Sequence, residues 1–191
     1  MSRPRPPRWP VLVLGFFAVL ATLSLLQGIV DVVLPVLQGE RAFGFLFSMT
    51  ERFGPAFFVS YIFVHNLGLA CLVPGYGFVA AWFERRTVNR FLIGILLTGA
   101  VVAALLVAVQ FVLSAPEQFE LPLALALLVG ESCGVLALAV ASAQELRGFV
   151  PTPAYEWSLV TPFRRLTVPL GYSALVLLIL SVWEAFAVLG A

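Results

Sequence analysis

Residues 121–144, with the sequence LPLALALLVGESCGVLALAVASAQ, decide the fold of this chain. Glu131 is the only charged residue in this stretch, and a membrane-spanning helix needs about 20 mostly apolar residues at about 1.5 Å rise per residue. Four other stretches meet the same requirement: 11–36, 55–73, 91–114 and 168–190. We therefore expect residues 1–191 to form a single integral membrane domain. It would be an all-α, polytopic bundle of about five spans, or six if 74–83 is a separate element.

The composition supports a membrane protein and excludes several other classes. Hydrophobic residues make up 61% of the chain and charged residues 11%, and the mean hydropathy is +1.04. A soluble domain carries roughly 25% charged residues, so this chain could not cover its apolar surface in water. The net charge of +1 gives no reason to expect a nucleic acid as partner. Cys71 and Cys133 both lie in apolar runs, which favours buried thiols over a disulfide.

The arginines predict the orientation in the cell membrane. All 11 basic residues are Arg, and only Arg41 and Arg52 fall between the first and second spans. The others precede the first span or lie between the second and third or the fourth and fifth. Basic residues accumulate in cytoplasmic segments, so we expect a cytoplasmic N-terminus and an external C-terminus.

The connections between spans differ in character. Residues 40–53 are rich in Phe and predict a helix lying at the headgroup level outside the membrane. Residues 145–167 hold three prolines, and predict either a cytoplasmic docking loop for partner proteins or an ordinary loop with interfacial aromatic residues. The sequence from Pro74 to Gly77 breaks the second apolar run, so residues 78–83 either continue the span or form a short interfacial helix.

Polar residues inside the spans are candidates for function, because such groups are costly in lipid and usually face the protein interior. The candidate cluster consists of His65, Asn66, Glu131, Glu184 and Glu120. Asp31 and Gln27 lie near the outer end of the first span. The predicted orientation gathers these side chains in the outer half of the membrane. They form either an outward-open acidic vestibule that binds a cation or proton, or interhelical hydrogen bonds that hold the bundle together.

The sequence gives no reason to expect an enzyme, a metal site or a cofactor. Phosphate-binding, zinc-protease, nucleophile-elbow and CxxC motifs are all absent from it. His65 is the only histidine, and its helical neighbours Gly68 and Leu69 cannot ligate a metal through their side chains.

Small residues follow one face of the fourth predicted span at helical spacing. They are Ala126, Gly130, Gly134, Ala137 and Ala141, and they include a GxxxG pattern. Such a stripe allows two helix backbones to approach closely. We therefore expect this helix to be central in the bundle, or to form a homodimer.

Four short elements resemble, in order, the pattern of the stage II sporulation protein M family. Asn66 matches the second residue of an Asn-Asn pair, Asn89 and Gly94 match the opening of the next span, and Glu184 matches a Glu in the last span. The segment with Pro116, Glu120 and Pro122 resembles a Pro-His-Gly-x-x-Glu-x-Pro motif, but it is one residue short and lacks the His and the Gly. The resemblance covers residues 60–190.

The resemblance implies a non-enzymatic scaffold or complex subunit that recruits partner proteins at the membrane. The family's named member belongs to a complex that recruits peptidoglycan-degrading enzymes during sporulation, and that role is not transferred here. The alternative is a small membrane transporter or channel that uses an acidic vestibule around Glu131 and His65.

Overall fold

The computed structural model describes residues 9–38, 43–80, 121–147 and 160–189, together with single positions between 94 and 105. Every regular element in these ranges is a helix, so the predicted all-α class is confirmed. The elements are α1 (Trp9–Gly28), η1 (Ile29–Val33), α2 (Leu34–Leu37), α3 (Gly44–Phe53), α4 (Pro55–Ala70), η2 (Val73–Gly77), α7 (Leu121–Arg147) and α9 (Val160–Leu189). Of these, η1 and η2 are π-helical turns.

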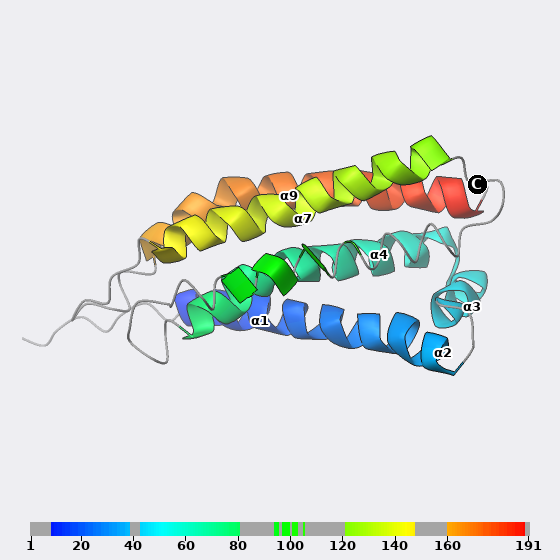
Figure 1. Ribbon diagram of the computed structural model, residues 1–191, viewed down its shortest axis with the longest axis horizontal. Helices are drawn as coiled ribbons and strands as arrows, with labels where there is room; N and C mark the ends of the chain where they lie inside the picture. Colours follow the sequence, from blue (N-terminus) through cyan, green and yellow to red (C-terminus); the bar gives the residue numbers. More distant parts are fainter. Residues whose placement is uncertain are drawn as a thin grey trace, which may run out of the picture.

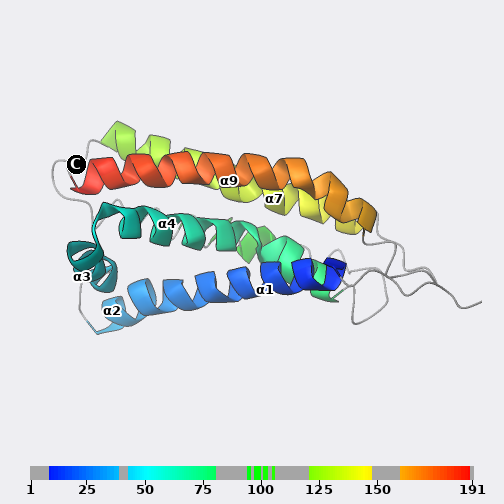
Figure 2. The same cartoon turned by 180° about the vertical axis from the view of Figure 1, so that it is seen from behind.

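The four long helices lie side by side along the length of the molecule (Figures 1 and 2). α7 packs along α9, α1 packs along α4, and α4 contacts both α7 and α9. The short helix α3 lies at the end of the bundle where the chain ends, next to the beginning of α4 (Figure 1).

Two of the helices are long and apolar enough to cross a membrane, at Leu125–Arg147 and Arg164–Leu189. A third qualifies if Pro55–Ala70 and Val73–Ala80, which are bent by 43° at the break between them, form one span. A shorter apolar helix covers Gly15–Asp31. The predicted span at 91–114 lies mostly outside the described residues.

The break after α4 is built into the core of the bundle. Pro74 has no N–H for the helical ladder, and the chain continues as η2 and then helically to residue 80. Phe78 is completely buried and belongs to the core of the bundle. The choice between a continued span and an interfacial helix stays a prediction for residues 78–80, and 81–83 lie outside the described ranges. At Gly75 an added Cβ would lie 3.0 Å from backbone atoms of Phe17, so the glycine lets α1 approach.

The predicted loop at 145–167 is wrong at both of its ends. α7 runs on to Arg147 and α9 already begins at Val160, which leaves only 148–159 between them. Pro162 lies in the first turn of α9, where the backbone N–H groups have no partner within the helix, so a proline costs little there. The sequence interpretation treated this proline as a helix breaker without considering its position in the turn.

Residues 44–53 form the helix predicted within 40–53, and residues 39–42 are not described. Leu46 and Thr50 are buried against the bundle, whereas Phe45, Phe47 and Phe53 are exposed. The helix ends at Gly54, whose φ of +85° is a left-handed conformation that favours glycine. Its location at the headgroup level stays a prediction.

Most of the buried apolar side chains form one cluster, which we call the core cluster. It joins Phe17 and Ala21 of α1, residues 69–73 and Phe78 around the break after α4, residues between Val135 and Leu146 of α7, and Leu166 and Leu177 of α9. A smaller cluster of Leu46, Phe58, Ile62 and Ala185 lies beside α3. Between the core cluster and α3, several polar side chains face one another among apolar ones.

Candidate functional site

The polar side chains surround a cavity between α1, α3, α4, α7 and α9, which we call the polar cavity. Its polar lining comes from Asp31, Tyr61, His65, Asn66, Glu131 and Glu184. Aromatic rings of Phe43, Phe47 and Phe58 line it on other sides. The space open to water-sized molecules measures about 30 Å³. Since one water needs about 10–15 Å³ of such space, the cavity has room for roughly two.

The contact between α1 and α4 is a set of paired polar groups. Ser24 donates its hydroxyl proton to the carbonyl of His65, and its Oγ lies 3.3 Å from Nδ1 of the same residue. The hydroxyl has only one proton, so Nδ1 must carry the proton of the second hydrogen bond. Nε2 of the neutral ring is then an acceptor. Gln27 Nε2 donates to the carbonyl of Tyr61 over 3.4 Å.

The approach that brings Ser24 to His65 depends on a glycine. A Cβ added at Gly68 would lie 2.5 Å from Cβ of Ser24 and 2.6 Å from the carbonyl oxygen of Leu20. Both distances are shorter than van der Waals contact, and the Leu20 atom belongs to the backbone and cannot rotate away. Gly68 is therefore required for α1 and α4 to meet at this separation.

Asp31 lies in the π-helical turn η1 and is 2% exposed. The hydroxyl of Tyr61 donates to Oδ2 of Asp31, and the backbone N–H of Phe43 donates to the Asp31 carbonyl over 2.7 Å. Oδ1 of the same carboxyl is buried and has no hydrogen-bond partner in the part of the chain that the structure describes. One oxygen of a buried carboxyl is thus left for a ligand or water.

The other two carboxyl groups meet each other. Asn66 Nδ2 donates to Glu131 Oε1 over 2.7 Å, and the carboxyl of Glu184 lies near that of Glu131 on the wall of the same cavity. Two carboxylates held close together repel each other, so a proton on one of them stabilises this arrangement. Oε2 of Glu184 is buried without a partner among the described side chains. The three residues belong to α4, α7 and α9, so this contact joins three helices.

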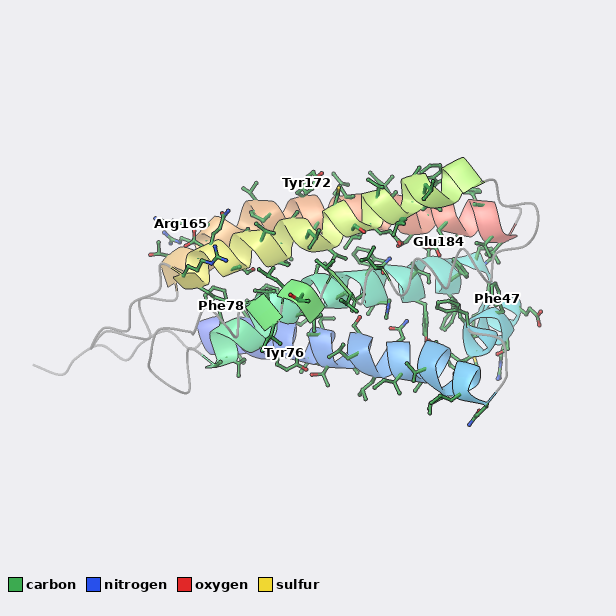
Figure 3. All side chains as sticks on the ribbon, in the orientation of Figure 1. Phe47, Tyr76, Phe78, Arg165, Tyr172 and Glu184 are labelled. Carbon is green, nitrogen blue, oxygen red and sulfur yellow. The ribbon has the colours of Figure 1, made fainter. Side chains whose placement is uncertain are left out.

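Among the described residues, no cationic side chain forms an ion pair with these carboxyls. Within the four described ranges the only ion pair joins Arg165 and Glu145 over 3.5 Å. Figure 3 shows Arg165 at one end of the bundle and Glu184 and Phe47 at the other. Nor do three or more His, Cys, Asp or Glu side chains of the described residues converge as ligands for a metal ion.

The structure brings four of the five candidate residues together, namely His65, Asn66, Glu131 and Glu184. Glu120 lies outside the described residues. Asp31 lines the cavity although the sequence did not place it in the candidate cluster. Tyr61 and Ser24 are not among the residues that the sequence predicted. The spacing of Ser24, Gln27 and Asp31 at i, i+3 and i+7 on one helical face was a signal for the α1 members.

Three of the seven positions that carry the family resemblance are not described. Asn89 and Pro116 lie outside the described ranges, as does Glu120. Gly94 is helical, and Pro122 lies in the first turn of α7. Of the matched positions with described side chains, Asn66 and Glu184 lie in the polar cavity.

The stripe of small residues on α7 faces α9 at its two glycines. An added Cβ would lie 2.9 Å from Leu180 at Gly130 and 2.8 Å from Leu177 at Gly134. Ala126 is exposed, and Ala137 and Ala141 are half-buried.

Cys71 is buried as expected, but Cys133 is exposed on α7. That expectation was wrong for Cys133, because an apolar run in a membrane helix also covers the surface that faces lipid.

Comparison with protein-family models, with curated proteins and with solved structures gave no match. The chemistry of the polar cavity is thus the basis for an assignment of function.

Proposed function

We propose that this chain is a five-span helical protein of the cell membrane that takes up a proton or small cation in the polar cavity and carries it across the membrane. The observation that supports this most is the contact between the carboxyls of Glu131 and Glu184, with no cationic side chain beside them in the described ranges. The alternative from the sequence, transport through an acidic vestibule, is thereby preferred over the scaffold.

The course of the chain supports five spans. α4 and η2 lead to the end of the bundle where α7 finishes, whereas α7 starts at the opposite end (Figure 1). The proposed span at 91–114 would connect these two ends of the bundle. The described positions between 94 and 105 are helical, and Leu97 packs against the core cluster.

The proposed orientation rests on the arginines. Arg147, Arg164 and Arg165 belong to the ends of α7 and α9 that lie away from α3. Basic residues favour the cytoplasmic side, so the polar cavity would open towards the outside.

The uncompensated carboxyls supply the chemistry. An ionised carboxylate in a low-dielectric interior costs several kcal/mol, so it binds a proton or a cation. The nearby carboxyls of Glu131 and Glu184 repel each other when both are ionised, so the pair favours uptake of a proton or a cation. Reversible uptake of that proton or cation is the step that a carrier needs.

The apolar core cluster favours a carrier over an open pore. Phe17, Leu69, Phe78 and Leu138 are all buried on the side of the polar cavity away from α3. The buried hydroxyls of Ser142 and Ser173 also lie on α7 and α9, but two isolated hydroxyls do not make a continuous polar path, so transport would require the described helices to move. The 43° break between α4 and η2 lies within this region.

Proton flux into proteoliposomes, measured with a trapped pH-sensitive dye under an imposed pH gradient, tests the proposal. Glu131→Gln and Glu184→Gln keep the shape of the side chains and replace the titratable carboxyl by an amide that does not ionise. We expect flux to fall by about tenfold or more in each, which corresponds to about 1.4 kcal/mol in a rate or equilibrium. Glu145→Gln is the matched control, because Glu145 pairs with Arg165 at the opposite end of the bundle.

Elution volume and helix content of each variant must match the unmodified protein for the comparison to count. Unchanged flux in the double variant Glu131→Gln/Glu184→Gln would refute the assignment of these carboxyls.

A scaffold remains the second candidate, favoured by the surface of α3 and by the family resemblance. Phe45 and Phe53 of α3 are 47% and 60% exposed, which is a surface that a second membrane protein could cover. Affinity capture from native membranes in mild detergent tests it. A stoichiometric partner that is lost when both Phe45 and Phe53 are changed to Ser, while proton flux persists, would favour the scaffold.

A further inference from the structure

The residues that line the polar cavity indicate which class of cation it binds, and Asp31 is the most informative of them. Asp31 lines the cavity with a side chain that is 2% exposed, and its Oδ1 is buried without a hydrogen-bond partner in the described ranges. Tyr61 donates to Oδ2, so Oδ1 is the oxygen of this carboxyl that has no partner among the described residues. Asp31 also lies in a π-helical turn, a distortion that occurs frequently at functional sites.

The groups that face Asp31 do not neutralise it. On α4, His65 is already engaged with Ser24, and Tyr61 donates a neutral hydroxyl. Across the cavity, α7 and α9 contribute the acidic pair of Glu131 and Glu184. The neighbouring backbone of α3 contributes one N–H, from Phe43, and that donates to the Asp31 carbonyl. A cationic ligand would therefore meet a negative charge in the cavity and would not have to displace a cationic side chain of the described residues.

The rest of the lining is unsuited to a bare metal ion. Metal ions such as Ca²⁺ and Mg²⁺ take six or more oxygen ligands in a closed shell. The acidic groups of the described residues do not converge in that way. Aromatic side chains instead line much of the wall, namely Phe43, Phe47, Phe58 and Tyr61, with 6.3 Å between the ring centroids of Phe47 and Phe58. Aromatic faces attract ammonium-type cations.

We propose that the polar cavity binds a small ammonium cation, of the size of ammonium or methylammonium, with Asp31 as its anchor. This rests on the proposed function and names the cation. An N–H of the ligand donates to Oδ1 of Asp31, and the ring of Tyr61 lies beside the same carboxyl. Glu184 also lines the cavity, and its Oε2 is a second buried oxygen without a hydrogen-bond partner among the described residues.

The size limit follows from the volume and from Gly28. With about 30 Å³ open to water-sized molecules, the cavity admits a ligand of one to about three non-hydrogen atoms. Gly28 lines the cavity, and a Cβ added there would lie 3.6 Å from Cε1 of His65, an ordinary van der Waals contact. Gly28→Ala therefore fits the backbone and only reduces the space. Gly15 of the same helix has nothing within 4 Å of its added Cβ, so Gly15→Ala is the matched control.

The test measures thermal unfolding of the full chain in detergent with methylammonium, ammonium, tetramethylammonium, sodium or potassium chloride, at equal ionic strength and constant pH. We expect saturable stabilisation by methylammonium and ammonium only, because tetramethylammonium has no N–H and is too large. Asp31→Asn should abolish the stabilisation. Gly28→Ala should weaken methylammonium binding by about tenfold and ammonium binding less, and Gly15→Ala should leave both unchanged.

The variants and salts separate the possible failures. If Asp31→Asn does not fold, Gly28→Ala decides, and equal affinity for methylammonium in Gly28→Ala and Gly15→Ala would overturn the proposal. Equal stabilisation by sodium or potassium would overturn the ammonium assignment and leave the carrier function standing. If no cation stabilises the protein while proton flux still requires Glu131 and Glu184, the ammonium assignment is likewise overturned and the carrier function stands. If no cation stabilises the protein and proton flux does not require these two carboxyls, the carrier function is refuted as well.

Discussion

The two halves of the bundle are built from the same helices but are held together by different interactions. In the half away from α3, the core cluster fills the space between α1, η2, α7 and α9 with buried apolar side chains. In the half next to α3, the polar cavity separates the helices, and hydrogen bonds such as those of Asn66 and Ser24 join them. Lipid is as apolar as a leucine side chain, so helices in a membrane gain little from hydrophobic burial alone. Close packing in one half leaves the other half free to hold costly polar groups.

Glycines show how the packed half is held together. Added Cβ atoms at Gly75 and Gly77 would lie 3.0 Å from the Phe17 backbone and 2.5 Å from Leu146, respectively. At Gly28, beside the cavity, the corresponding distance to His65 is 3.6 Å. The contacts of Gly75 and Gly77 in the packed half are thus tight, as is that of Gly68 at the border of the two halves, whereas Gly28 beside the cavity leaves room for a methyl group.

The largest effect is expected at the border of the two halves, from Gly68→Ala. The new Cβ would overlap Ser24 and the carbonyl oxygen of Leu20, so α1 and α4 must separate. We expect a loss of roughly 1–3 kcal/mol in the free energy of unfolding, as for an overpacked core. Thermal or denaturant unfolding in detergent measures it, with Gly15→Ala as control. Equal stability of the two variants would contradict the importance of close packing.

A smaller effect is expected from Asn66→Ala in the half with the cavity. It removes the donor to Glu131, and interhelical hydrogen bonds in membranes contribute about 0.6 kcal/mol on average and up to about 1.7 kcal/mol. We expect a loss in that range together with changed proton flux. Ser60→Ala is the control, because Ser60 lies on the exposed side of α4 and donates only to Ala56 of its own helix. A loss as large as that of Gly68→Ala would show that both halves hold the bundle equally.

The smallest effect is expected from Arg165→Gln at the end of the packed half. The Arg165 side chain is 67% exposed, and its nitrogen lies 3.5 Å from Glu145. Exposed ion pairs contribute about 0–1 kcal/mol, so unfolding should shift little. A clear loss of stability in Arg165→Gln at both low and high salt would mean that this pair contributes more than its exposure suggests.

The sequence predicted features that depend on neighbouring residues better than features that depend on residues far apart in the chain. The helical class and the depth of His65 and Glu131 in their helices follow from runs of apolar residues. The loop at 145–167 was misjudged because Pro162 was counted without its place in a helical turn. Asp31 was undervalued because its partner Tyr61 lies 30 residues away, and spacing within one helix cannot reveal a partner on another.

The sequence by itself determined that this chain forms apolar helices, because the backbone satisfies its hydrogen bonds within each helix and hydropathy is a property of neighbouring residues. Only the tertiary structure decided which polar groups meet. Asn66 and Glu131 are 65 residues apart, and their contact depends on how α4 and α7 are rotated and how closely they approach. Glycines and side-chain shapes from several helices set that rotation together, so no single stretch of sequence contains it.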